Sequence, residues 1–240
     1  MTTKEHYDNH LGPFYEWMTG DFDIRQKEQQ DFFEGNGIMP LQNKMAIDLG
    51  SGHGLQSIAL ARLGFQVKSV DFNRLLLDHL RIRGDGLGIQ VFHRDLLSGE
   101  NFKEPAELIV CMGDTIAHLA SPEEIRTLLD RCCGCLLNHG KLVLSYRDYG
   151  TELRDANRFI PVKSDENKIL TCFLEYVEDR VRVTDLLHER INGRWTQKAS
   201  SYFKVRTTDQ LMSQLLIETG FTIQKKEVIN RMNYLVAAKI

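Results

Sequence analysis

Three glycines and two aspartates form the pattern in this chain that is best suited to binding chemistry. Gly50, Gly52 and Gly54 lie in "DLGSGHG", directly after an apolar stretch that carries Asp48. Because glycine has no Cβ atom, a ligand can approach this backbone closely and the chain can adopt unusual dihedral angles. Asp71 ends the next apolar stretch about twenty residues later, where a carboxylate can accept hydrogen bonds from ribose hydroxyls. The pattern therefore indicates a site for a nucleoside-bearing ligand.

The spacing of the glycines separates two classes of nucleoside ligand. A dinucleotide-binding turn has the form G-x-G-x-x-G, whereas here the spacing is G-x-G-x-G and Leu55 occupies the third glycine position. The carboxylate of Asp71 would also repel a 2′-phosphate. Structural alternatives remain open at this point: the glycines suit any tight strand-to-helix turn, and Asp71 is placed to cap a helix that begins at Asn73.

The elements around this motif alternate between strands and helices. Apolar stretches predict strands at residues 44–49, 66–72, 89–93, 107–113 and 141–147, with helices at 55–63, 73–82 and 122–137 between them. Such alternation is typical of a parallel sheet with helices on both faces. A helix within 207–220 then precedes strands at 221–229 and 234–240, whose short connection makes them antiparallel. Residues 148–206 fit no crossover, and we expect an antiparallel insertion over the mouth of the sheet.

With these elements in order, the chain resembles the class I S-adenosylmethionine (SAM) dependent methyltransferases. The resemblance rests on the glycine motif, on Asp71, on Asp95 after the third strand, on "CMGD" at the end of the fourth strand and on the terminal hairpin. It implies an α/β, Rossmann-like fold with a seven-stranded, mostly parallel sheet, an antiparallel C-terminal hairpin and an antiparallel β cap insertion. It also implies SAM as cofactor, bound by Asp48, Gly50, Ser51, Gly52, Gly54, Asp71, Phe72, Asp95, Leu96, Met112 and Gly113. For Asp95, an ordinary loop turn is the alternative.

Two shorter segments resemble the glycine N-methyltransferase branch of that family. "LIVCMGDTIAHL" matches it at Cys111, Gly113, Ala117, His118 and Leu119, and "LSYRDYG" matches it at Arg147 and Tyr149. The resemblance implies that Arg147 binds a substrate carboxylate, which suits the planar fork of a guanidinium group, while His118 and Tyr149 orient or deprotonate the substrate amine. The alternatives are that Arg147 pairs with a nearby aspartate and that His118 bonds a backbone carbonyl.

The chain departs from that branch at two positions next to these residues. Asp114 stands where the branch has asparagine, and Tyr146 stands where it has histidine before the arginine. A negative charge at Asp114 would favour a cationic or amino-bearing substrate, so Asp114 is a candidate substrate-binding residue. These departures leave the identity of the substrate open.

The N-terminal segment is rich in aromatic residues. In many methyltransferases of this type such a segment covers the cofactor, and aromatic faces attract cations such as a sulfonium or a methylated ammonium. Tyr15 and Trp17 are the candidate substrate-binding residues, because Gly12 and Pro13 mark a turn that can fold them inward. Packing between helices is the alternative. We expect one domain, divided into a helical lid (1–40), a SAM-binding core (41–147), a β cap (148–206) and a last helix with hairpin (207–240).

Composition limits the remaining possibilities. The chain has 240 residues, 42% of them apolar, which suffices for one sizeable core, and its net charge of −3 provides no general attraction to nucleic acid. No apolar run reaches the length of a signal peptide core or membrane helix, so we expect a cytoplasmic protein without membrane partners. Five cysteines do not suggest a secreted disulfide framework. A zinc site at Cys132, Cys135 and His139 is an alternative, but it lacks a second ligand pair, and we expect no metal.

We therefore predict an enzyme that transfers a methyl group from SAM to a small molecule, namely an amine or a carboxylate-bearing acceptor. Two alternatives stay open: a methyltransferase acting on RNA or protein, and a SAM-binding regulatory protein without turnover. The basic residues between 180 and 206 alternate with acidic ones, whereas an RNA groove needs continuous positive charge with stacking aromatic residues. Nucleic acid is accordingly not an expected partner, while a homo-oligomer remains open.

Overall fold

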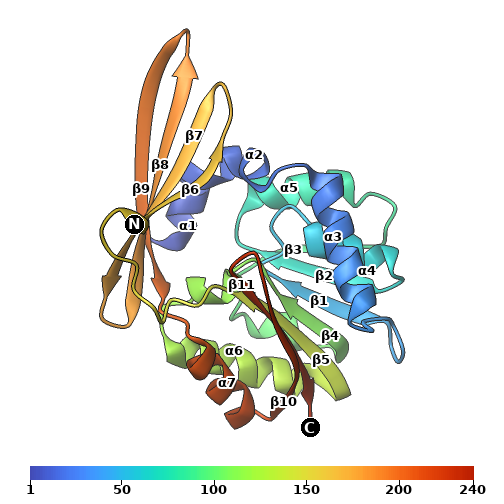
Figure 1. The fold of residues 1–240 in the computed structure, drawn as a ribbon. Coiled ribbons are helices and arrows are strands. Elements are labelled where there is room, and N and C mark those ends of the chain that lie inside the picture. Colours follow the sequence, from blue (N-terminus) through green and yellow to red (C-terminus); the bar gives the residue numbers. More distant parts are fainter.

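A seven-stranded sheet forms the centre of the molecule, which a computed structural model describes over residues 1–240. Its strand order is β10-β11-β5-β4-β1-β2-β3 (Figure 1). Only β11 runs antiparallel to the other strands. The strands are β1 (Met45–Leu49), β2 (Gln66–Asp71), β3 (Gln90–His93), β4 (Ala106–Cys111), β5 (Leu136–Tyr146), β10 (Phe221–Ile229) and β11 (Met232–Lys239). The predicted parallel sheet with a closing C-terminal hairpin is confirmed.

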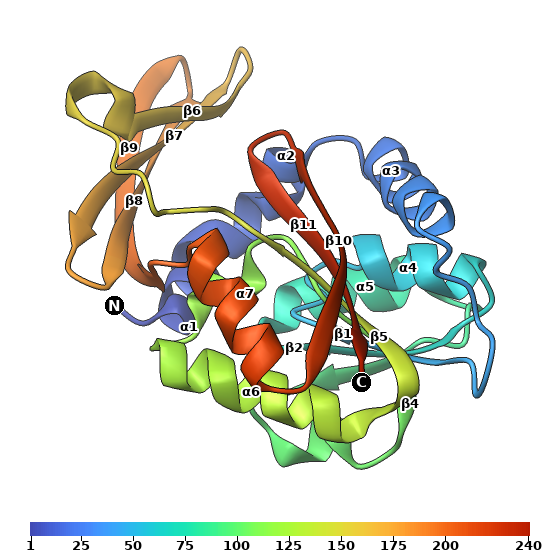
Figure 2. The same ribbon diagram turned by 60° about the horizontal axis from the view of Figure 1, so that its bottom comes forward.

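Helices cover both faces of this sheet (Figure 2). One face carries α3 (Phe22–Gly35), α4 (Leu55–Arg62) and α5 (Arg74–Arg83), and the other carries α6 (Pro122–Cys135) and α7 (Asp209–Glu218). Successive side chains of β4 point to opposite faces of the sheet and therefore belong to two cores. Leu108 and Val110 join the cluster around α3 and α4, and Ile109 joins the cluster around α6 and α7. No helix is long and apolar enough to cross a membrane.

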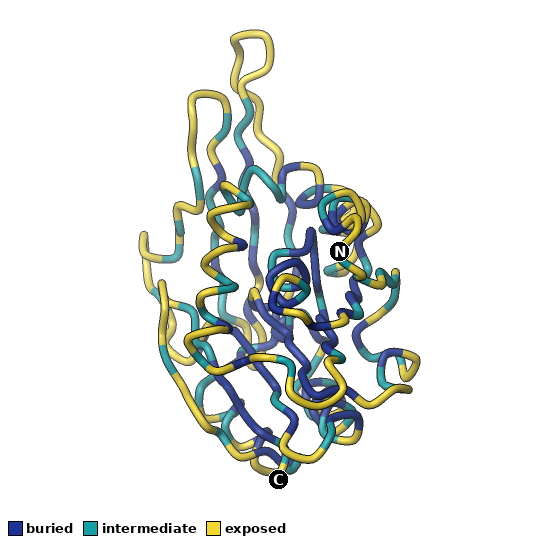
Figure 3. The backbone as a smooth tube through the Cα atoms, turned by 90° about the vertical axis from the view of Figure 1, so that its right-hand side faces the viewer, coloured by how far each residue is buried: buried dark blue, intermediate teal, exposed yellow.

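The insertion between β5 and α7 forms a separate four-stranded sheet, the cap. Its strands are β6 (Phe159–Ser164), β7 (Lys168–Val177), β8 (Arg180–Ile191) and β9 (Arg194–Val205), each antiparallel to its neighbours. The cap rises above one end of the central sheet, and its hairpin tips are exposed (Figures 1 and 3). Its two ends meet at the base, because Tyr149 N donates to Thr207 O at 2.8 Å and Thr207 Oγ1 donates to Arg147 O at 2.8 Å.

The N-terminal segment lies between the cap and the central sheet (Figure 1). It consists of the short helices α1 (Thr3–His6), η1 (Tyr7–Leu11), η2 (Gly12–Phe14) and α2 (Tyr15–Thr19). Buried His6 fastens it to the cap, with Nε2 3.0 Å from Asp185 Oδ2 and Nδ1 2.8 Å from Ser200 Oγ. The segment ends at Gly20, whose φ of 93° and ψ of −158° are essentially restricted to glycine.

Candidate active site

A cavity lies where β1, β2 and β4 end, at the edge where ligands bind in open sheets of this type. It is lined from the core by Gly50, Gly52, Asp71, Phe72, Leu76, Leu96, Gly113, Thr115 and His118, and from the N-terminal segment by Tyr7 and Tyr15. The free space among these residues is about 40 Å³, which is too small for a nucleoside. A nucleoside therefore enters this cavity only when the N-terminal segment shifts.

Two glycines hold the loop after β1 in shape. Gly50 has a φ of 76°, and a Cβ atom there would collide with the side chain of Thr115. Gly54 is the N-cap of α4 with a φ of 101°, and a Cβ atom there would collide with Leu80. Both residues thus meet a close approach and a left-handed backbone, which only glycine tolerates without strain. Between them, Gly52 faces the cavity.

Asp71 closes the loop from the end of β2. Its Oδ2 accepts a hydrogen bond from Gly52 N at 2.9 Å, and its Oδ1 accepts one from Asn73 N at 2.7 Å. The N-cap of α5 is Asn73 itself, whose side chain accepts from Leu76 N. Burial raises the pKa of Asp71, against the lowering effect of the backbone hydrogen bonds. Each carboxylate oxygen keeps a free lone pair, so ribose hydroxyls can still donate to Asp71.

The N-terminal segment supplies tyrosines to the other side of the cavity. Tyr15 lies over the loop, its ring 5.2 Å from that of His53 in an edge-on arrangement, and burial raises its pKa to about 12. Thr19 Oγ1 lies 3.2 Å from His53 Nε2. Burial lowers the pKa of His53 to about 4, so this imidazole is neutral at pH 7. The glycine loop is thereby joined to the segment that covers it.

His118 lines the cavity next to the N-terminal segment. Its Nε2 lies 3.3 Å from the hydroxyl of Tyr7, while its buried Nδ1 has no hydrogen-bond partner. Burial, followed by the neighbouring charge of Lys204, holds its pKa well below the usual range. The imidazole is therefore neutral, and in the tautomer that donates from Nε2 to Tyr7 the Nδ1 atom carries a free lone pair. Such an atom can accept a proton from a bound acceptor.

Asp114 is the centre of a buried polar cluster. Its carboxylate accepts from Lys204 Nζ at 2.6 Å, from Tyr149 Oη at 2.8 Å and from Arg147 N at 2.9 Å. Asp114 is 2% exposed and has a φ of 68°, which is rare for a residue other than glycine. The expectation that this carboxylate attracts a cationic substrate needs correction, because the Lys204 ammonium group already neutralises it.

Arg147 and Tyr149 do not line the cavity described above. Both line a second cavity of about 630 Å³ between the cap and the end of β5. The Arg147 guanidinium group is exposed and makes no ion pair, so the alternative that it pairs with a nearby aspartate is wrong. Burial, and then Asp114, raise the pKa of Tyr149 well above its usual value, so this phenol stays protonated and donates to Asp114. Tyr149 is therefore no proton acceptor at neutral pH.

Several predicted cofactor residues lie behind the cavity or beside it. Asp48 points toward α4, where it accepts from Ser57 Oγ at 2.5 Å, and burial raises its pKa to about 7. Asp95 is exposed and accepts from Leu97 N at 2.7 Å, as in the loop-turn alternative. Ser51, Gly54 and Met112 are buried but do not line the cavity. The lining residues that sequence reasoning missed are Tyr7, Leu76 and Thr115.

Trp17 and the cysteines also occupy positions outside the cavity. Trp17 Nε1 donates to Asp165 Oδ2 at 2.5 Å, which ties the N-terminal segment to the turn between β6 and β7. Cys132 lies on the buried face of α6, and Cys135 Sγ donates to Glu104 O at 3.2 Å. No group of three or more His, Cys, Asp or Glu side chains is arranged to hold a metal ion.

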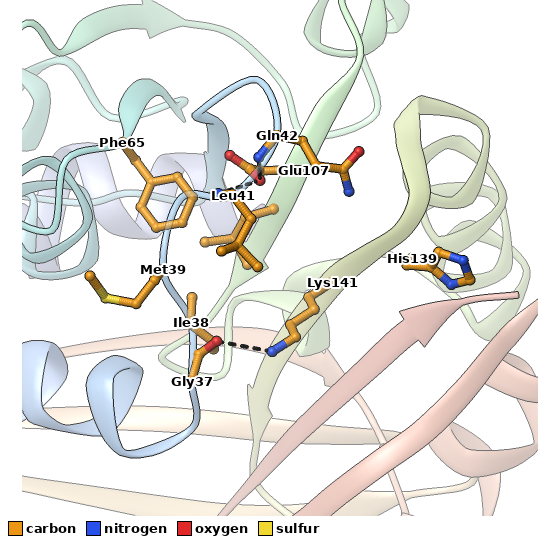
Figure 4. Close-up of a pocket in the computed structure, with 10 residues that line it drawn as sticks. Gly37, Ile38, Met39, Leu41, Gln42, Phe65, Glu107, His139 and Lys141 are labelled. Carbon is orange, nitrogen blue, oxygen red and sulfur yellow. Dashed lines mark hydrogen bonds between the residues drawn. The ribbon is translucent and has the colours of Figure 1, made fainter.

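A further pocket lies at the opposite end of the sheet (Figure 4). Its polar groups stabilise the chain before β1: Glu107 accepts from the backbone amides of Leu41, Gln42 and Lys44, and Lys141 Nζ donates to Gly37 O at 3.1 Å. About 50 Å³ is free there. Because these groups are already paired within the chain, the pocket carries no reactive constellation.

Comparison with known families identifies the core. Residues 46–140 match the family model described as a methyltransferase domain. Among curated proteins, the ubiquinone biosynthesis O-methyltransferase of Xylella fastidiosa (strain 9a5c) is 35% identical over 112 residues, covering 45% of this chain and 43% of that protein. The glycine/sarcosine N-methyltransferase of Halorhodospira halochloris is 29% identical over 155 residues, covering 61% and 55%. The chain thus spans about half the length of these relatives.

A solved structure matches almost the whole chain. It is SAM-bound CalS10 from Micromonospora echinaspora, an amino pentose methyltransferase involved in calicheamicin biosynthesis. The match has a TM-score of 0.76 and 13% identity, and it covers 96% of this chain and 97% of that chain. At this identity the likeness concerns the fold, and it includes the cap and the N-terminal segment because of its coverage.

Proposed function

We propose that this chain is a class I SAM-dependent methyltransferase that transfers a methyl group from SAM to a small molecule, which the family match over residues 46–140 and the fold support. The observation that carries the proposal is the cavity at the strand ends. There the Gly50–Gly54 loop, the carboxylate of Asp71 and the tyrosines of the N-terminal segment surround one space. This combination suits a nucleoside with a cationic group, because Asp71 can accept from ribose and aromatic faces attract cations.

The residues of the cavity fit the cofactor by their chemistry. When bound, SAM supplies a methyl group that is already activated by its sulfonium. The protein therefore needs only to bind SAM, to orient the acceptor toward the methyl group and to exclude water. We assign ribose binding to Asp71 and close backbone contact to Gly50, Gly52 and Gly113. Residues 2–19 act as a lid that opens at Gly20 to admit the cofactor and then closes Tyr7 and Tyr15 over it.

His118 is the proposed proton acceptor for the reaction. An amine or hydroxyl acceptor loses a proton when its nitrogen or oxygen forms a bond to the methyl carbon. The neutral imidazole of His118 lines the cofactor cavity and has an unpaired Nδ1, so it can take that proton. Tyr7 fixes the orientation of the ring through Nε2, which makes lid closure a condition for productive geometry. Nitrogen and oxygen acceptors are both compatible with this arrangement.

The first experiment measures the melting temperature with SAM, S-adenosylhomocysteine (SAH) and NAD added separately. The protein is first unfolded and refolded, so that any ligand carried through purification is removed. A ligand at 100 times its Kd stabilises the native state by about 2.7 kcal/mol, which raises the melting temperature of a chain of this size by roughly 5–11 °C. SAM and SAH are expected to give this increase, and NAD is not.

Two aspartates that follow neighbouring strands provide a matched pair of variants. Asp71→Asn removes the charge that lines the cavity, whereas Asp95→Asn changes an exposed residue outside it. We expect a weaker Kd for SAM in Asp71→Asn only, as measured by calorimetry. Transfer of labelled methyl groups to amines, amino acids and phenols then tests turnover and separates an enzyme from a SAM-binding regulator. A folded wild-type protein that binds neither SAM nor SAH would refute the proposed function.

A further inference from the structure

The second cavity differs from the cofactor cavity in size and charge. It lies between β6 and β7 of the cap, the loop after β5 and the turn between β10 and β11, and its volume of about 630 Å³ is within the usual range of small-molecule sites, roughly 300–1,000 Å³. Its apolar wall contains Leu153, Phe159, Ile160, Pro161, Leu174 and Tyr176. This space is far larger than a small amino acid requires.

Two arginines face this cavity without a partner. Arg147 follows β5 and Arg231 lies in the turn before β11, and the pairing of Tyr146 with Asn233 places both at the same edge of the sheet. Neither guanidinium group makes an ion pair or a hydrogen bond within the chain. Asp148 also lines the cavity but forms no ion pair with either arginine, and its oxygens accept from the backbone amides of Gly150 and Asp209. Two arginines against one carboxylate leave the lining with a net positive charge, which favours the binding of an anion.

The backbone at Arg231 provides an independent observation. Asn230 and Arg231 have φ values of 50° and 62° and form the two-residue turn between β10 and β11. Turns with two positive φ angles prefer glycine at the second position. A long side chain at such a position is strained, and strained residues concentrate where a ligand is bound. Arg231 therefore offers something that glycine could not, namely a guanidinium group at the cavity.

We propose that this cavity is the acceptor site and that the acceptor carries an anionic group, bound jointly by Arg147 and Arg231, on an apolar or aromatic body. The inference rests on the proposed function, and it adds Arg231 and the cap wall to the single arginine that the family resemblance implied. The two cavities lie on either side of the Tyr149–Asp114 hydrogen bond. Tyr149 lines the second cavity, and Gly113 and Thr115, the chain neighbours of Asp114, line the cofactor cavity. The experiment below decides whether the anion is a carboxylate or a phosphate.

The test titrates the SAH-loaded protein with three probes, benzoate, phenyl phosphate and the neutral benzamide, and follows binding by calorimetry. Benzoate or phenyl phosphate should bind and benzamide should not, and the tighter of the two anions identifies a carboxylate or a phosphate site. Arg231→Gly and Arg147→Gln should each weaken anion binding about tenfold or more, because each removes a charge-assisted contact. Arg194→Gln, at a hairpin tip of the cap outside the cavity, is the matched control.

Arg231→Gly also separates a binding role from a structural one. Glycine relieves the positive φ angle, so the melting temperature of the ligand-free variant should be unchanged or higher while anion binding is lost. Three results would overturn the inference: benzamide binding as well as the anions, wild-type anion affinity in both variants, or no saturable binding of either anion. The melting shift caused by SAH is recorded for every preparation. If this shift is absent, the proposed function is wrong, and the same titrations on the protein without SAH then judge the anion site separately.

Discussion

Replacing either member of the Asp114–Lys204 ion pair should destabilise the protein far more than replacing both. The two side chains are only 4% and 10% exposed, and their charged atoms lie 2.6 Å apart. In Asp114→Asn the Lys204 ammonium group stays buried without an anion. In Lys204→Met the Asp114 carboxylate keeps only Tyr149 and Arg147 N as donors. Each single variant therefore leaves an uncompensated charge in a place with little water.

The expected size follows from the burial of this pair. Breaking a buried ion pair by removing one partner costs about 3–5 kcal/mol, whereas replacing both partners by uncharged residues is often close to neutral. For a domain of this length, each kcal/mol corresponds to roughly 2–4 °C in melting temperature. The single variants should thus melt about 6–20 °C below the wild type. The double variant should melt above either single variant.

Urea unfolding of the wild type, the two single variants and the double variant at pH 7 measures the coupling energy between Asp114 and Lys204. The control is Lys198→Met in the same strand, since the Lys198–Glu189 pair is 2.9 Å long but its lysine is 60% exposed. That variant should lose less than about 1 kcal/mol. Strictly additive losses in the double variant would refute the reasoning. So would single losses as small as the control, because they would mean that water reaches Asp114.

Three other perturbations test the local chemistry. Burial raises the pKa of Asp48 to about 7, so the native state retains a proton that the unfolded chain releases above pH 4. The free energy of unfolding therefore falls as the pH rises from about 4 to 7. In Asp48→Asn, denaturant unfolding at pH 5 and pH 8 should no longer show this decline. Gly50→Ala should cost about 1–3 kcal/mol more than Gly113→Ala in thermal unfolding, because both have a positive φ but only Gly50 meets a close neighbour; equal losses would contradict this account. His6→Leu leaves buried Asp185 without its imidazole partner and should release the lid, seen as faster proteolysis within residues 2–19 and weaker SAM binding; an unchanged cleavage rate would argue against the tether.

The architecture was predictable from the sequence because its determinants are local. The strands of the core are short apolar runs. The glycine turn and the two-residue hairpin turn are each formed by residues that are consecutive in the sequence. The individual strands of the cap were not assigned, and β6 shows why: it is short, contains Pro161 and is mostly exposed, so it lacks a clear alternation of apolar and polar residues. Length and composition placed the cap correctly between β5 and the last helix, without its internal pairing.

The site was less predictable because its contacts join distant segments. Lys204 reaches Asp114 across 90 positions, and Tyr7 reaches His118 across 111 positions. A usable pattern existed for Lys204: Ser200, Tyr202 and Lys204 share the inward face of β9 with a period of two. The separation of Arg147 from the cofactor cavity has no such signature, because it depends on where the cap lies over the sheet.

The closed base of the cap has a consequence for how such proteins diversify. Because Tyr149 and Thr207 are hydrogen-bonded at the points where the chain leaves and re-enters the core, residues 150–206 form a cassette whose ends nearly coincide. Recombination could exchange this cassette wherever the incoming one again supplies partners for Asp114 and His6, as Lys204 and Asp185 do here. Arg147 and Arg231 would stay behind in the core, while the apolar wall would leave with the cassette. A lineage built this way would inherit its preference for an anion and acquire new acceptor skeletons by replacing a single stretch of gene.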